Sequence, residues 1–263
     1  MTLSVRTLEF ADAREAADLG AFLARLIHYD RAAAVRLQAG GGGAGGGALA
    51  VFGRPASFEV LAIRTARLGA PYPPRAAAPL DVTVSAGELL DSIDAPSAAA
   101  VPASGDPASS ASSVEDSART AVVPTAVTGP PWAGVLPPRG GWRQVPGLPG
   151  AEAIGRALAG AVAEFRARDE QLAPGDRTRA ARDRIGREIW SRTLGDTHLP
   201  LRAVHAAQSL GFLRPVRALV PAGAAPEEPP ALLESGSWLR LRTAYGSIAV
   251  RRAGLGGLTV TPA

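Results

Sequence analysis

In the first ninety residues, the spacing of hydrophobic positions is that of a strand in some segments and that of a helix in others. Residues 3–10 alternate apolar and polar, which predicts a strand. Residues 12–29 repeat apolar positions every three to four residues, which predicts a helix with Asp12 as N-cap and Glu15 three residues on. Three further strands are predicted at 33–38, 48–53 and 58–68, followed by a strand and short helix over 81–93 with Ser85 as cap. We therefore expect residues 1–93 to form a small α+β domain, with one helix on an antiparallel meander.

Residues 94–128 lack the pattern of either element. The segment is almost entirely Ala, Ser, Pro, Asp and Val, and it offers no large side chain that could anchor a core. This composition predicts a disordered linker.

The remaining residues, 129–263, predict a helical module. The module opens with a Pro- and Gly-rich segment in which Trp132 and Trp142 are expected to act as anchors. Apolar spacing then predicts three helices, at 151–171, 177–194 (capped by Asp176) and 200–210. After a loop at 218–235, alternation predicts a β-hairpin at 237–252 that turns at Tyr245-Gly246. Three helices followed by a hairpin is the element order of a winged helix-turn-helix, so the expected class is α+β with a winged-helix-like C-terminal module.

Composition narrows the classes of protein. With 46% apolar residues the chain can build a core, and with no cysteine it has neither disulfides nor cysteine-ligated metal. The N-terminus lacks the apolar core of a signal peptide, and no apolar stretch of about 18 residues occurs. We expect a cytoplasmic protein without a membrane partner.

Charge is distributed unevenly. Every one of the 28 basic residues is Arg, and the formal net charge is only +4. Residues 1–93 are neutral and residues 94–128 carry −3, whereas residues 129–263 hold 18 Arg and 11 acidic residues, a net charge of +7. A basic C-terminal half is the electrostatic pattern of a polyanion-binding module.

Two sets of side chains could contact duplex DNA if the module is a winged helix. The third helix would enter the major groove, where Arg202, His205 and Gln208 could reach base edges. Alternation along the hairpin predicts an apolar face (Leu239, Leu241, Ile248 and Val250) and an opposite face with Trp238, Arg240, Arg242 and Arg251. The hairpin would hold phosphates through four arginines: Arg240, Arg242, Arg251 and Arg252. The leading hypothesis is a non-enzymatic DNA-associated or regulatory protein. The alternative is a protein–protein interaction adaptor that uses the same module for docking and binds no nucleic acid.

Patterns for catalysis or metal binding are weak. His198 and His205 are seven residues apart, whereas a helical metal pair prefers a spacing of four. The chain has no Gly-x-Ser-x-Gly elbow and no paired carboxylates in an apolar setting. We therefore predict no enzyme activity, no metal and no cofactor. A third hypothesis, an enzyme of another kind, would require a concave pocket with converging polar groups.

Overall fold

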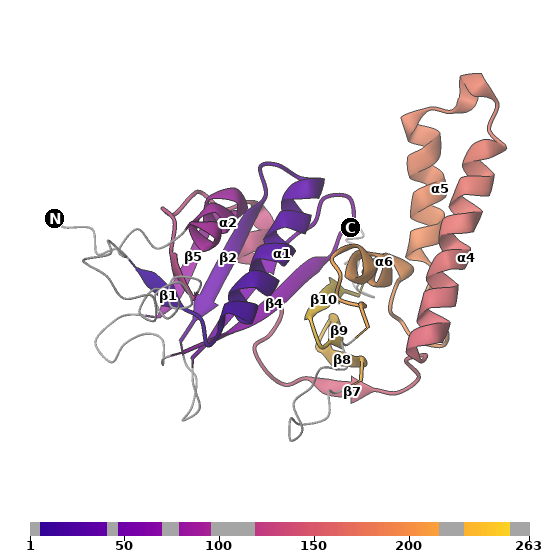
Figure 1. The fold of residues 1–263 in the computed structure, drawn as a ribbon. Coiled ribbons are helices and arrows are strands. Elements are labelled where there is room, and N and C mark those ends of the chain that lie inside the picture. The colour runs from indigo at the N-terminus through magenta and orange to yellow at the C-terminus, as the bar shows by residue number, and fades with distance from the viewer. Residues whose placement is uncertain (1–5, 41–46, 70–78, 96–118, 216–228, 253–263) are drawn as a thin grey trace, which may run out of the picture. The chain divides into compact units, whose positions relative to one another are not determined.

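The fold is mixed α+β, as the sequence predicts, with antiparallel strand pairing and five α-helices in the described residues. A computed structural model describes residues 6–40, 47–69, 79–95, 119–215 and 229–252 (Figure 1). The chain divides into two compact units. The first comprises Met1–Ser57 and Leu61–Leu136, and the second comprises Phe58–Val60 and Pro137–Ala263.

The first unit is built on four antiparallel strands. They are β2 (Ala34–Ala39), β3 (Gly47–Gly53), β4 (Leu61–Leu68) and β5 (Leu80–Ser85). β2, β3 and β4 pair in sequence as a meander, but β5 returns to pair with β2, so the order is β5-β2-β3-β4. The simple meander predicted from the sequence is therefore wrong for β5, because hydrophobic alternation does not specify the neighbour of a strand.

Two helices accompany this sheet, where the sequence predicted a layer of one. α1 (Ala13–Tyr29) begins at Asp12, whose carboxylate accepts a hydrogen bond from the Glu15 amide at 2.9 Å. α2 (Ala86–Asp94) begins at Ser85, whose hydroxyl accepts from the Glu88 amide at 3.4 Å, and it packs against α1. Both predicted caps are confirmed. The short helix α2 follows β5 as predicted. Because α2 packs against α1, the two helices form one layer, whereas the sequence predicted a layer that consists of a single helix.

The end of the expected linker forms part of the first unit. β6 (Thr120–Val122) pairs with β1 (Thr7–Glu9), and the Arg36 guanidinium donates to the carbonyl oxygen of Ala133. Residues 119–136, including Trp132, therefore belong to the first unit, whereas the sequence predicted that the C-terminal module begins at residue 129. The physical reason is that β1 needs a partner for its backbone, and a strand can supply one without any large side chain. Residues 96–118 of the expected linker lie outside the described residues.

Four further antiparallel strands belong to the C-terminal unit. Its strands, in the order β10-β9-β8-β7, are β7 (Arg143–Val145), β8 (Ala231–Ser235), β9 (Trp238–Thr243) and β10 (Gly246–Arg251). The predicted hairpin is confirmed, but it turns through Ala244-Tyr245, one residue earlier than expected. β7 and β8 were predicted as irregular structure, because each is short and carries little alternation of its own.

Three helices complete this unit, close to their predicted positions. α4 (Ala151–Glu170) and α5 (Arg179–Ser191) run side by side as an antiparallel pair (Figure 1), and α6 (Leu201–Ser209) packs against both helices and β10. The predicted cap Asp176 is wrong. It ends a 3-10 turn, and the Thr178 hydroxyl instead accepts from the Ala181 amide at 3.2 Å.

Membrane insertion finds no support in these helices. In the part of the chain that the structure describes, no helix combines the length and apolar character needed to cross a bilayer.

Candidate functional site

The helix predicted to read bases is largely buried. α6 packs against α4, α5 and β10, and most of its side chains face protein. The buried residues are Leu201, Ala203, Val204, Ala206 and Ala207. Of the three predicted base-reading residues, only Gln208 is exposed, and Arg202 is half-buried with an Nε atom that has no hydrogen-bond partner among the described residues. A helix enclosed on three sides presents only a narrow strip to a DNA groove.

His205 is enclosed by aromatic rings. Its imidazole stacks on Trp190 with the ring centroids 4.2 Å apart, and the Phe58 ring meets it edge-on at 5.1 Å. Burial lowers the pKa of His205 below its ordinary value, because the charged imidazolium would lose solvation. Burial and the two ring contacts therefore favour a neutral His205 ring packed within the second unit.

The hairpin arginines come together on one face of the hairpin formed by β9 and β10. Directly opposed residues share a face, and the register places Trp238 opposite Arg251 and Arg240 opposite Ala249. Arg242 lies two residues along β9 and hence on the same side. We call this set, Trp238, Arg240, Arg242 and Arg251, the arginine face. The opposite side is the buried apolar face, with Leu239, Leu241, Ile248 and Val250.

Arg240 is the central cation of the arginine face. Its side chain is half-buried, and its Nε atom is shielded from solvent and has no hydrogen-bond partner in the part of the chain that the structure describes. Burial lowers the pKa of Arg240 first, and the neighbouring charge of Arg242 lowers it further. Both effects disfavour the charged form of the side chain, yet arginine stays protonated in proteins. The site therefore has a positive charge that the described protein only partly compensates.

Two tryptophans lie beside these cations. The Arg240 guanidinium carbon is 5.7 Å from the centroid of the Trp142 ring, and that of Arg251 is 5.8 Å from the Trp238 ring. The Trp142 indole donates to the Pro138 carbonyl oxygen at 3.0 Å, which fixes its orientation. The sequence identified Trp142 only as an anchor. Its position near Arg240 depends on β7 and β8, which the hydrophobic pattern did not predict.

Arg252, the fourth predicted phosphate ligand, differs from the others. It follows Arg251 directly and ion-pairs with Glu234 at 3.5 Å, while also donating to the Gly236 carbonyl oxygen at 2.7 Å. Glu234 pairs in register with Leu239, so this carboxylate lies on the apolar side of the sheet. Arg252 is thus compensated, and we do not count it in the arginine face.

Much of the positive charge on the helices is also compensated. Arg168, Arg182 and Arg192 each form an ion pair at 2.8 Å or less with a carboxylate on the facing helix, linking α4 to α5: Arg168 with Glu188, Arg182 with Asp169, and Arg192 with Glu164. The net charge of +7 therefore does not translate into a uniformly basic surface on this unit.

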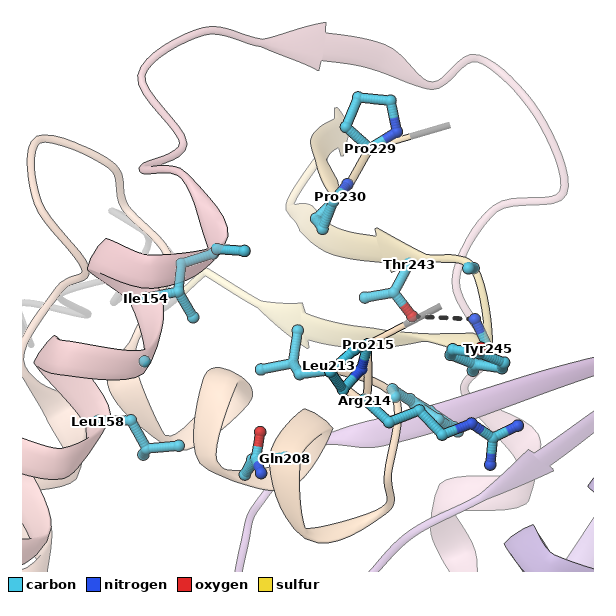
Figure 2. Close-up of a pocket in the computed structure, with 14 residues that line it drawn as sticks. Ile154, Leu158, Gln208, Leu213, Arg214, Pro215, Pro229, Pro230, Thr243 and Tyr245 are labelled. Carbon is cyan, nitrogen blue, oxygen red and sulfur yellow. Dashed lines mark hydrogen bonds between the residues drawn. The ribbon is translucent and has the colours of Figure 1, made fainter. Parts of the chain in front are cut away.

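A separate concave pocket lies within the second unit, between α4, the end of α6 and the hairpin turn. Its volume is about 380 Å³ (Figure 2). The walls are mainly apolar and include Ile154, Leu158, Phe212, Leu213 and Tyr245. Arg214 is the cationic residue in the lining, and its guanidinium carbon lies 3.7 Å from the centroid of the Tyr245 ring. We call this cavity the hairpin pocket.

Metal binding has no geometric support in the described ranges. Nowhere in them do three or more His, Asp or Glu side chains gather as a metal ion would require.

Comparisons with known proteins match each half of the chain to a different family model. Residues 3–112 match a domain of unknown function, DUF8010, and residues 137–255 match a second one, DUF8185. The second match begins at Pro137, where the main segment of the second unit also begins. Neither the curated proteins nor the solved structures gave a match.

Proposed function

We propose that this protein is a non-enzymatic DNA-associated or regulatory protein that binds the phosphate backbone of duplex DNA on the arginine face. The observation that carries the proposal is Arg240, a half-buried cation beside a second arginine, whose Nε atom has no hydrogen-bond partner among the described residues. Removing part of a charge from water costs free energy unless an opposite charge or hydrogen bonds replace the solvent. A phosphate oxygen would supply both to Arg240.

The neighbouring side chains support this use of the arginine face. Arg242 and Arg251 lie on the same side of the sheet, and Arg251 is exposed. Trp142 and Trp238 lie within cation–π range of Arg240 and Arg251, which favours extended, ordered guanidinium groups. Planar guanidinium groups can bind phosphate through two parallel hydrogen bonds.

The proposal concerns phosphates and not bases. α6 would have to read bases in the winged-helix arrangement, but it is packed against three elements of its own unit. Phosphate contacts position a protein on DNA without reading its sequence. We therefore expect binding with weak sequence preference and strong dependence on salt.

The test measures fluorescence anisotropy of a labelled DNA duplex with the full-length chain. Arg240 and Arg251, each neutralising one phosphate, predict a slope of log affinity against log salt of about −2. Arg240→Gln is expected to weaken binding and to make that slope shallower by about 1. The variant should fold, because the substitution removes a half-buried charge that has another arginine beside it.

Arg184→Gln is the matched control. Arg184 is exposed on α5, and within the described ranges it forms no ion pair. The same change of charge there should leave the affinity nearly unchanged. Undetectable or salt-insensitive binding, or equal losses for the two variants, would contradict the proposal. The interaction adaptor would then be the remaining use of this module.

A further inference from the structure

We propose that the hairpin pocket binds a small uncharged molecule that is mainly hydrocarbon and carries one hydroxyl or carbonyl group, with the hydrocarbon part against α4 and the polar group at Gln208. This inference goes beyond DNA binding and rests on a different set of residues. Its basis is a concave site with apolar walls, in which one polar side chain of the described lining makes no hydrogen bond to the described residues (Figure 2).

Apolar side chains form most of the wall. Ile154 and Leu158 come from successive turns of α4, and Leu213 comes from the segment after α6 (Figure 2). Pro229 and Pro230 form a further wall, which adds apolar surface without a backbone amide donor. Such walls favour a hydrocarbon group, because its contact with them removes apolar surface from water on both sides.

The walls are held in place by elements of the same unit. α6 packs against both α4 and β10, and these elements bring the lining residues together. Phe212, at the end of α6, is buried and also lines the pocket. A site whose walls are already packed loses little conformational entropy when a ligand enters it.

The charged side chain of the lining does not favour a charged ligand. Arg214 is the charged residue among the described lining residues, and its guanidinium carbon lies 3.7 Å from the centroid of the Tyr245 ring. A side chain that is already engaged in this way is not a free partner for an ionised ligand. Because an ionised group would lose solvation against the apolar walls, the pocket favours an uncharged molecule.

Other polar groups along the wall are few. The Thr243 hydroxyl is engaged, because it donates to the Gly246 carbonyl oxygen at 2.9 Å and accepts from the Tyr245 amide at 3.3 Å. Gln208 is exposed on α6, and its side-chain amide forms no hydrogen bond within the described ranges. An amide can donate to a carbonyl or hydroxyl oxygen and accept from a hydroxyl. One such group fits a ligand with a single polar terminus better than a sugar or nucleotide.

The volume limits the size of the ligand. Ligand pockets commonly measure about 300–1,000 Å³, and the hairpin pocket, at about 380 Å³, lies near the lower end of that range. A single short hydrocarbon chain fits this volume better than a two-chain lipid. We therefore choose octanol as the probe.

The experiment is isothermal titration calorimetry of the full-length chain with three probes that share the same chain length. Octanol, octanoate and octyltrimethylammonium present a neutral, a negative and a positive head group. We expect octanol to bind at a single saturable site. Each charged probe should bind about tenfold more weakly, because its head group loses solvation that the lining does not replace.

Gly155→Leu tests the position of the ligand. Gly155 lines the pocket, and a side chain added there would enter open space, so the variant should fold with its pocket filled. Gly160→Leu is the control, since Gly160 lies on the same helix with equally open surroundings but does not line the pocket. We expect Gly155→Leu to abolish octanol binding and Gly160→Leu to preserve it.

Gln208→Ala tests the position of the polar group. Loss of the hydrogen bond to the octanol hydroxyl should weaken binding about fivefold, the fold-change that corresponds to about 1 kcal/mol. Gln171→Ala is the matched control, because Gln171 is also exposed and follows α4 but does not line the pocket. Its octanol affinity should stay near that of the original chain.

Four outcomes would overturn the proposal. They are the absence of saturable octanol binding, a charged probe that binds as tightly as octanol, equal binding by Gly155→Leu and Gly160→Leu, and equal affinities of Gln208→Ala and Gln171→Ala. Intact octanol binding in Arg240→Gln, together with weakened DNA binding, would support a site that is separate from the arginine face.

Discussion

At the scale of single residues, His205 shows how packing changes the chemistry of a side chain. Its imidazole lies between Trp190 and Phe58, and burial lowers its pKa. As the pH falls below the unfolded value of about 6.5, the unfolded chain binds a proton before the folded chain does. The contribution of His205 to the free energy of unfolding is therefore complete above that pH and decreases as the pH falls toward the lower folded pKa.

His205→Phe should make stability less dependent on pH. The phenyl ring can keep an aromatic contact with Trp190 but cannot bind a proton, so the loss of stability between roughly pH 7 and pH 5 should become smaller. Thermal unfolding followed by circular dichroism across this range measures the effect. His198→Phe is the control, because His198 is exposed. Identical pH profiles for His205→Phe and the original chain would contradict this account.

At the scale of elements, the β9–β10 turn is held close to the end of α6. Gly246 has a φ of 154°, and a Cβ atom built there would lie 2.6 Å from the Cζ atom of Phe212. Phe212 follows α6 and is buried. Glycine at position 246 therefore lets the hairpin pack directly on this ring, which is also one of the residues that line the hairpin pocket.

Gly246→Ala should destabilise the second unit more than Gly236→Ala. Gly236 has a φ of 55° with open space around it, so alanine there costs about 1 kcal/mol of backbone strain. At Gly246 the overlap with Phe212 adds to the backbone cost, and we expect a loss of roughly 3 kcal/mol. Urea unfolding of both variants measures the difference. Equal losses would show that the ring moves aside at little cost.

At the scale of the whole molecule, the second unit includes a short segment from the first half of the chain. Phe58–Val60 belongs to the second unit, although its sequence neighbours on both sides belong to the first. Ser57 and Glu59 have φ values of 69° and 53°, which residues other than glycine rarely adopt. We infer that burial of the Phe58 ring beside His205 offsets the strain of this crossing.

Phe58→Ala should therefore destabilise the second unit by about 3–5 kcal/mol, the usual cost of removing a buried phenyl ring. Hydrogen exchange followed by mass spectrometry should show faster exchange in α5 and α6. Phe52→Ala is the control, since both rings are 8% exposed and Phe52 lies in β3 of the first unit. In Phe52→Ala, the faster hydrogen exchange should appear in β2 and β4 instead. Unchanged exchange in α5 and α6 of Phe58→Ala would contradict the assignment.

Local patterns were predictable because they depend on neighbours along the chain. The caps Asp12 and Ser85 follow from hydrogen bonds to amides three residues on, and the division of the hairpin into arginine and apolar faces follows from the two-residue period of a strand. β8 was missed because its five residues show no clear alternation of burial. The cap Asp176 was misassigned because a 3-10 turn precedes α5.

The sequence by itself determined the α+β class, the positions of the long helices and the side of the hairpin that carries Arg240. These depend on periodicity and capping, which act over a few residues. Only the tertiary structure decided that β5 returns to β2, that α6 is buried, and that Trp142 and Arg240 lie together. Such features depend on which distant segments share backbone hydrogen bonds and exclude water from each other, and a hydrophobic pattern allows many such pairings.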